Sequence, residues 1–184
     1  KEFIQSINRK YPGIVIIFTW AHFMSQIYIP NDYNLLASFI DGMIEGADEN
    51  TKLVDGWEAS YGCKDERGYL DAFNLMRNKM SCLSTVPELY RRKMYAGFGL
   101  WLDYDWRGIG WNLTDFTKNY FQPVEFENSV TAALKTSDSY VWVWSETVNW
   151  WTGDKIPMEY AEAFRRGKSR AAQEISNILY PAGK

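Results

Sequence analysis

Four acidic residues, Glu58, Asp103, Asp105 and Glu146, each lie where an apolar segment of the sequence turns polar. Carboxyl groups in pairs can hydrolyse a glycosidic bond, because one protonates the leaving oxygen while the other attacks or stabilises the oxocarbenium-like centre. The sequence therefore predicts that this set supplies the acid and the nucleophile of a glycoside hydrolase.

Asp103 is the preferred nucleophile or transition-state stabiliser. It is expected on the same strand face as Asp105, and two neighbouring carboxylates disfavour simultaneous ionisation. A structural alternative stays open for each acid, since a strand-end carboxylate can also accept a backbone N–H or pair with Arg107.

Glu146 is the preferred general acid, with Glu58 as the next candidate. Trp142 and Trp144 share the expected strand face of Glu146, and apolar surroundings keep a carboxyl protonated nearer neutral pH.

Aromatic residues make up 17% of the chain, which has nine tryptophans. An indole combines a flat apolar face with one N–H donor, which suits a sugar ring. The alternative is an aromatic-rich core or partner interface. The candidate carbohydrate contacts are Trp20, Trp57, Trp101, Trp144 and Trp150, with His22 as a hydrogen-bonding partner for a sugar hydroxyl.

Several classes of function are disfavoured by composition. His22 is the only histidine and Cys63 and Cys82 are the only cysteines, too few for a usual zinc site. Asp and Glu could still hold Mg²⁺ or Ca²⁺ through oxygen ligands, but the sequence has no loop of alternating acids that marks a calcium site, so we expect no metal and no cofactor. A net charge of −3 with scattered basic residues argues against nucleic acid as a partner. The longest apolar run, residues 14–23, is too short to cross a membrane. The two cysteines are compatible either with a disulfide or with free thiols.

The elements that must position these residues follow a repeating order. Strands are expected over residues 14–20, 53–60, 96–106 and 140–146, so that they begin 39 to 44 residues apart. Helices are expected before residue 10, over 35–44, as two stretches between 65 and 95 divided at 84–88, from about 123, and over 157–178. This order predicts an α/β fold of four parallel βα units in one domain, 1–184. A (β/α)8 barrel has eight such units, so the chain would be half of one, with its acids at the carboxyl ends of the strands.

A resemblance supports the same interpretation. The segments 53–58, 96–106 and 140–146 together resemble uncharacterised bacterial proteins grouped with glycoside hydrolases. The resemblance implies a (β/α)8 (TIM) barrel acting on glycans, of which this chain would be the C-terminal half. Many barrel glycosidases carry the acid/base after the fourth strand and the nucleophile after the seventh, so the chain would hold Asp103 or Asp105 without its partner.

Three functions follow from these patterns. The first is a glycoside hydrolase acting on an oligo- or polysaccharide, for which a secreted or periplasmic location would be suitable. The second is a non-catalytic carbohydrate-binding domain that uses the same aromatic residues. The third is a half-barrel that forms a homodimer through its open strand edges.

Overall fold

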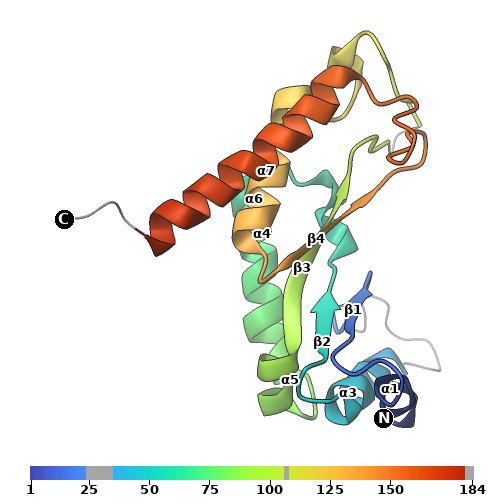
Figure 1. Ribbon diagram of the computed structural model, residues 1–184, viewed down its shortest axis with the longest axis vertical. Helices are drawn as coiled ribbons and strands as arrows, with labels where there is room; N and C mark the ends of the chain where they lie inside the picture. The colour runs from blue at the N-terminus through green and yellow to red at the C-terminus, as the bar shows by residue number, and fades with distance from the viewer. Residues whose placement is uncertain (24–34, 106–107, 181–184) are drawn as a thin grey trace. The chain divides into compact units, whose positions relative to one another are not determined.

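The computed structural model describes residues 1–23, 35–105 and 108–180 and confirms an α/β fold (Figure 1). Its sheet is parallel, with helices between the strands, and its strands follow one another in sequence order. They are β1 (Val15–Phe18), β2 (Lys52–Asp55), β3 (Met94–Trp101) and β4 (Tyr140–Trp144).

The strand register is set by short apolar segments. Val15 pairs with Lys52 and Phe18 with Asp55, while Leu53 pairs with Met94. Just before β4, the N–H of Asp138 donates to the carbonyl of Ala96 at 2.9 Å, and its carboxylate accepts the N–H of Ala96 at 2.7 Å. Asp138 therefore fixes the start of β4 beside β3.

The helices lie close to their predicted ranges. They are α1 (Glu2–Asn8), α3 (Leu36–Gly46), α4 (Glu66–Asn74), α5 (Pro87–Lys93), α6 (Pro123–Thr136) and α7 (Met158–Leu179). The chain continues from α4 through the π-helical turn η2 (Leu75–Lys79) into the 3-10 helix η3 (Met80–Cys82), and two further 3-10 helices are η1 (Glu58–Gly62) and η4 (Phe116–Lys118). Pro87 occupies the first turn of α5, where its missing N–H is not needed.

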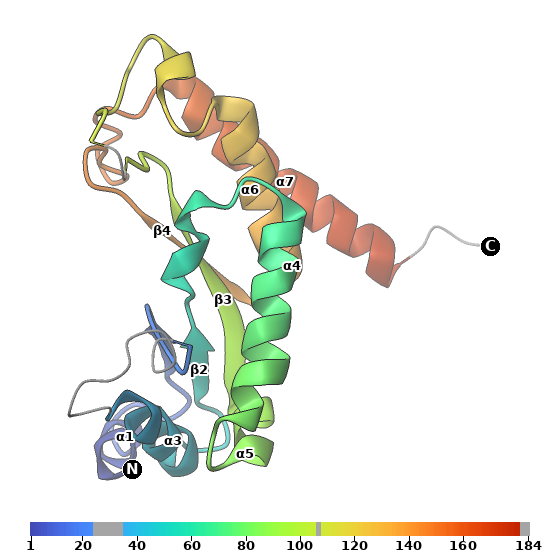
Figure 2. The same cartoon turned by 180° about the vertical axis from the view of Figure 1, so that it is seen from behind.

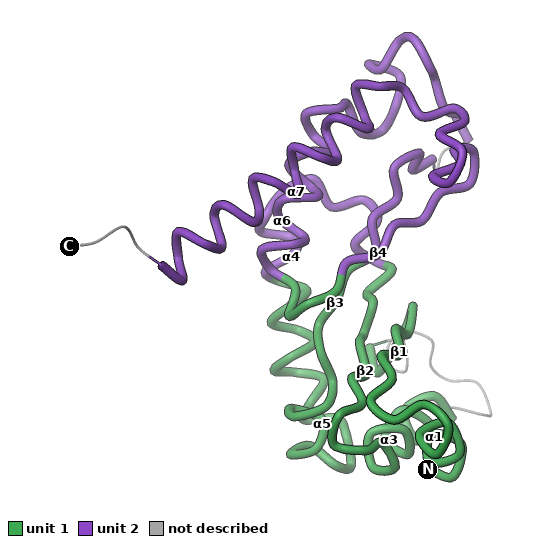
Figure 3. The backbone as a smooth tube through the Cα atoms, in the orientation of Figure 1, with its two compact units in different colours: residues 1–58, 71–98, 137–140 green, residues 59–70, 99–136, 141–184 purple. Residues whose placement is uncertain are grey.

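The chain divides into two compact units (Figure 3). Unit 1 comprises residues 1–58, 71–98 and 137–140, and unit 2 comprises residues 59–70, 99–136 and 141–184. Each unit has its own buried side chains and is described by itself.

Unit 1 packs α1, α3 and α5 around an apolar cluster. Figure 2 shows α1 beside α3, and Gly46 permits this approach because a Cβ there would lie 2.7 Å from the Ile4 side chain. The buried members of the cluster are Ile4, Ala21, Ile40, Met43, Ile44, Ala47, Leu53, Met80, Tyr90 and Met94.

Unit 2 is built on two helices that run side by side, α6 and α7 (Figure 1). Gly167 of α7 lies so close to α6 that a Cβ would meet the Glu127 carbonyl at 2.8 Å. The side chains buried in unit 2 include Phe121, Phe126, Val130, Ala133, Tyr160, Ala163 and Ala171.

All four strands end earlier than predicted, and for β2, β3 and β4 this corrects the expected place of the acids. After β2 the Trp57 N–H donates to the Asp55 carboxylate at 3.2 Å and Trp57 adopts a φ of +40°, so that Glu58 begins the 3-10 helix η1 instead of ending a strand. β3 ends at Trp101, so Asp103 and Asp105 lie in the following turn and do not share a strand face. β4 ends at Trp144, two residues before Glu146.

Two residues that enter the predictions lie outside the described residues, namely Trp106, the last residue of the third expected strand, and Arg107. Cys63 and Cys82 are both free thiols. In the part of the chain that the structure describes, no helix is long and apolar enough to cross a membrane.

Candidate functional site

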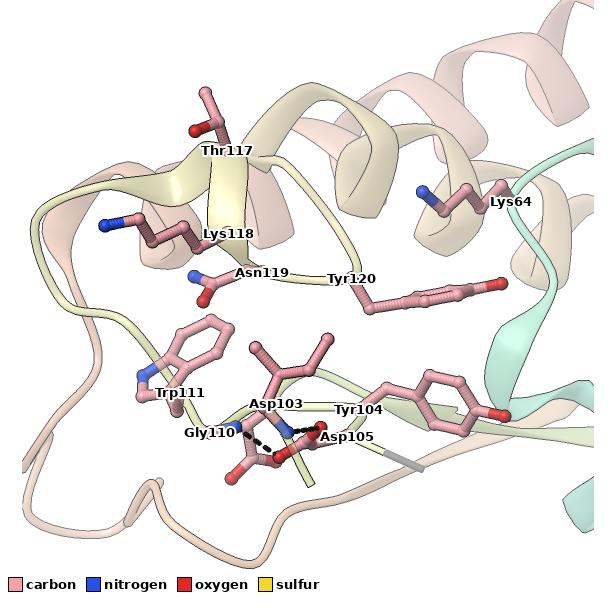
Figure 4. A pocket seen from close by; sticks show the side chains of 11 residues that line it. Lys64, Asp103, Tyr104, Asp105, Gly110, Trp111, Thr117, Lys118, Asn119 and Tyr120 are labelled. Carbon is pink, nitrogen blue, oxygen red and sulfur yellow. Dashed lines mark hydrogen bonds between the residues drawn. The ribbon is translucent and has the colours of Figure 1, made fainter. Parts of the chain in front are cut away.

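A pocket of about 390 Å³ follows the carboxyl end of β3 in unit 2 (Figure 4). Of the predicted site residues, Asp103 and Asp105 line it. The other lining residues are Lys64, Tyr104, Ile109, Gly110, Trp111, Thr117, Lys118, Asn119 and Tyr120. Residue 64 and the short segments 103–105, 109–111 and 117–120 therefore supply its walls.

The aromatic wall of the pocket consists of Tyr104, Tyr120 and Trp111. The rings of Tyr104 and Tyr120 meet edge to face with centroids 4.6 Å apart. The Trp111 indole packs against Tyr160 at 4.8 Å, and its Nε1–H donates to the carbonyl of Lys155 at 2.9 Å. These contacts fix the ring positions before any ligand is bound.

Asn119 orders the loop that carries Trp111. Its side chain accepts the N–H of Asn112 at 2.8 Å and donates to the carbonyl of the same residue at 2.9 Å. Its amide also donates to the hydroxyl of Tyr160, which in turn donates to the carbonyl of Phe121. The network joins the loop 112–121 to the start of α7.

Two lysines contribute positive charge to the pocket. The Lys64 ammonium contacts both carboxylate oxygens of Glu125 at 3.0 Å and lies 4.4 Å from the centre of the Tyr120 ring. Lys118 is exposed and pairs with Asp115 at 3.3 Å. Each lysine of the pocket thus has an acidic partner.

Asp105 closes its own loop. Its carboxylate accepts the N–H of Ile109 at 2.7 Å and the N–H of Gly110 at 2.5 Å, drawn as dashed lines in Figure 4. Gly110 has a φ of +91°, a conformation that glycine adopts without strain. Asp105 thus fits the structural alternative given for each acid, in which a strand-end carboxylate accepts backbone N–H groups.

Asp103 is 3% exposed and accepts three consecutive backbone N–H groups. These are the amides of Glu146 at 3.1 Å, Thr147 at 2.5 Å and Val148 at 3.2 Å. The structure therefore brings the carboxylate of Asp103, the predicted nucleophile, to the backbone of Glu146, the predicted general acid. The side chain of Glu146 itself is exposed.

The three remaining predicted residues of unit 2 differ in exposure. Trp101 is half-buried and meets Tyr104 edge to face at 5.0 Å. Trp144 is 45% exposed. Trp150 is half-buried against Phe164 of α7, with ring centroids 5.3 Å apart. None of the three lines the pocket described above.

The four predicted residues of unit 1 do not line the pocket after β3. Trp57 is 6% exposed and contacts the ring of Phe23 at 4.3 Å, so its ring faces the interior. Trp20 and Glu58 are half-buried.

His22 is buried in unit 1 and hydrogen-bonded to Asp41 at 2.8 Å, while its ring stacks on Tyr90 at 5.3 Å. Burial lowers the pKa of His22, although the Asp41 carboxylate opposes this effect. In the described structure this imidazole is a buried core group in contact with Asp41 and Tyr90.

Two buried acids of unit 1 were missed by sequence reasoning. Asp41 accepts the Ser84 hydroxyl at 2.6 Å and the Thr85 N–H at 2.8 Å. Asp55 is 1% exposed, and its Oδ2 has no hydrogen-bond partner among the described residues. Burial raises the pKa of Asp55 to about 7, against the smaller effect of the Trp57 N–H. The sequence feature that could have identified Asp55 is its position inside the apolar run of residues 53–57.

The pocket residues Lys64, Tyr104, Trp111, Asn119 and Tyr120 were also missed, because they lie on loops and carry no motif. Among the described residues, no three His, Cys, Asp or Glu side chains are grouped so that they could hold a metal ion.

Comparison with known proteins assigns no family to the chain. No protein-family model, no curated protein sequence and no solved structure matches it.

Proposed function

We propose that the chain binds a carbohydrate in the pocket after β3 and belongs to a glycoside hydrolase with a (β/α)8 barrel. The observation that supports the proposal is the joint presence of three ordered aromatic rings and polar side chains in one pocket at a carboxyl strand end. Such a combination suits sugar rings, which present apolar faces and hydroxyl groups together.

Glu146 is the proposed general acid, since it lies just after β4 with an exposed side chain. Asp103 is assigned a positioning role, because its carboxylate holds the backbone of Glu146 through the amide bonds described above. Asp105, which lines the pocket, is the proposed second carboxylate.

A non-catalytic carbohydrate-binding role is the second candidate. It is favoured by one observation: both acids of the pocket, Asp103 and Asp105, already accept backbone N–H groups. Acids engaged in this way order loops and can orient sugar hydroxyls without taking part in hydrolysis.

Calorimetric titration with soluble xylan, glucomannan and mixed-linkage β-glucan tests the proposal. We expect wild-type protein to bind one of them and Trp111→Ala to weaken that binding about tenfold, since stacking on an aromatic ring contributes on the order of 1 kcal/mol. Leu113→Ala is the matched control, because Leu113 is 46% exposed near Trp111 and does not line the pocket. Equal affinities for Trp111→Ala and wild type would contradict the site.

Reducing-sugar release from the polymer that binds separates the two candidates. A hydrolase loses most of its turnover in Glu146→Gln while its affinity for the polymer stays the same, because that substitution removes the proton donor alone. Binding without turnover by the wild type would favour the non-catalytic role.

A further inference from the structure

Trp151 lies in the loop 145–156 of unit 2 and is 98% exposed. Its neighbour Trp150 packs against Phe164 instead. Two adjacent tryptophans thus have different surroundings: one anchors the loop to α7, and the other is presented entirely to solvent.

The turn that carries Trp151 is closed by hydrogen bonds. The side-chain oxygen of Asn149 accepts the N–H of Trp151 at 2.9 Å and that of Thr152 at 3.1 Å. The backbone of Asn149 bonds to Gly153 at 2.8 Å and to Asp154 at 3.0 Å, and Gly153 adopts a φ of +77°. The backbone beneath the indole is therefore ordered without a ligand, which lowers the entropy cost of binding through this ring.

Both ends of this loop are bonded to residues that line the pocket. At its start, Asp103 accepts the amides of residues 146–148. At its end, the carbonyl of Lys155 accepts the Trp111 indole N–H at 2.9 Å. Trp151 is thus displayed on a loop fixed to the pocket by a carboxylate and by one of its aromatic rings.

The surroundings of Trp151 favour a carbohydrate over a protein as its partner. The exposed residues next to it, Thr152, Asp154 and Lys155, are polar. A stable protein interface buries a contiguous patch with an apolar centre, and a single indole among polar groups does not provide one. An exposed flat ring on a turn whose other exposed side chains carry hydroxyl, carboxylate and ammonium groups is complementary to a sugar unit.

We infer that Trp151 is a second aromatic subsite, so that the ligand is a polysaccharide long enough to contact the pocket and the 145–156 loop together. This inference rests on the proposed function. It adds that the chain binds a polymer more tightly than a monosaccharide, by means of a residue outside the pocket.

Native gel electrophoresis with embedded xylan, glucomannan or mixed-linkage β-glucan tests the inference. We expect Trp151→Ala to weaken retardation by the polymer about tenfold, whereas Trp151→Phe, which keeps a flat ring, retains most of it. Tyr180→Ala is the matched control: Tyr180 is 77% exposed and follows the C-terminal end of α7, whose 22 residues span about 33 Å by helix rise. Its retardation should equal that of wild type.

The outcomes separate this inference from the proposal that it extends. If wild type is retarded and Trp111→Ala is not, but Trp151→Ala equals wild type, the second subsite is wrong and the pocket stands. If no polymer retards the wild type, the carbohydrate proposal fails and this inference fails with it. In calorimetry, Trp151→Ala should bind the monosaccharide unit of the polymer that retards the protein with the same affinity as wild type. A lower affinity of Trp151→Ala for the monosaccharide would contradict a second subsite that is separate from the pocket.

Discussion

At the scale of single residues, the carboxyl of Asp55 in unit 1 is buried at a cost in free energy. Its carboxyl is buried and only one of its oxygens accepts a hydrogen bond among the described residues. A carboxyl in such surroundings is more stable protonated, and its ionisation opposes folding.

The raised pKa of Asp55 predicts a specific dependence of stability on pH. A folded pKa of about 7 against an ordinary value of 3.8 means that Asp55 stabilises the fold fully below pH 4 and loses this contribution as pH rises through 7. The difference corresponds to about 4 kcal/mol, since one pKa unit is worth about 1.4 kcal/mol. Urea unfolding of wild type and Asp55→Asn at pH 4.5 and pH 8 measures it.

The comparison isolates Asp55, because other titrating groups such as His22 and Asp41 are common to both proteins. We expect Asp55→Asn to gain stability relative to wild type on going from pH 4.5 to pH 8. Asp71→Asn, which changes an exposed acid of α4, is the control and should follow the wild type. A constant difference between Asp55→Asn and wild type at both pH values would show that Asp55 titrates normally.

The sequence shows acids near the ends of apolar runs, but it does not show their surroundings. Asp103 and Asp105 were expected on the third strand and instead follow its end, and their carboxylates accept N–H groups of residues 4 to 45 positions away, which no local pattern encodes. Trp57 and Trp151 are the same residue type, yet the Trp57 side chain is 6% exposed and the Trp151 side chain is 98% exposed. Burial is decided by tertiary packing, so it could not be obtained from the residue type.

At the scale of elements, Asp41 joins α3 to the turn before α5. Its carboxylate accepts hydrogen bonds from the Ser84 hydroxyl and from the backbone N–H and the hydroxyl of Thr85. It is also hydrogen-bonded to the imidazole of His22. Burial acts to raise the pKa of Asp41, but the hydrogen bonds from Ser84 and Thr85 outweigh it and hold the pKa below its ordinary value. Its stabilising effect is therefore present at neutral pH and is lost as pH falls through that lowered pKa.

Removing this acceptor should weaken the connection between the two helices. Asp41→Asn turns one accepting oxygen into a donor that faces other donors, and we expect a loss of about 2 to 3 kcal/mol in the free energy of unfolding at pH 7. Ser84→Ala removes a single donor and should cost about 1 kcal/mol. Thermal and urea unfolding measure both, and equal losses would contradict the role of Asp41 as the shared acceptor.

The loop after β4 depends on Asp103 in a similar way. Asp103→Asn replaces an oxygen that accepts consecutive amides, so we expect hydrogen exchange at residues 146–148 to accelerate about tenfold or more. Asp105→Asn is the matched control and should accelerate exchange at residues 109 and 110 only. Unchanged protection of 146–148 would show that other contacts hold this loop.

At the scale of the whole molecule, the succession of strands and helices was predictable because it depends on local periodicity and on turn residues. Apolar runs of strand length and the 3.6-residue pattern of the helices are properties of neighbouring residues. The ends of the strands were not predictable, since they are set by the Asp55 turn and by Asp103 and Asp105. The division into two units, which crosses β3 between Phe98 and Gly99, has no composition shift to mark it.

The edge position of β1 in the sheet predicts self-association. Val15 and Ile17 of β1 are 39% and 41% exposed, and an edge strand with exposed apolar residues can pair with another chain. We expect a concentration-dependent dimer in sedimentation velocity, weakened by Ile17→Lys and not by Ile178→Lys, whose wild-type residue is 73% exposed on α7. A wild type that sediments as a monomer at all concentrations would contradict this prediction.

The two cysteines give the molecule a built-in pair of labelling sites. Cys82, in unit 1, is exposed, whereas Cys63, in unit 2, is half-buried and burial raises the pKa of its thiol. Maleimide dyes react with the thiolate, so Cys82 should take up the first fluorophore and Cys63 the second under stronger conditions. Energy transfer between a donor on one unit and an acceptor on the other would then report their separation in solution, without any engineered residue.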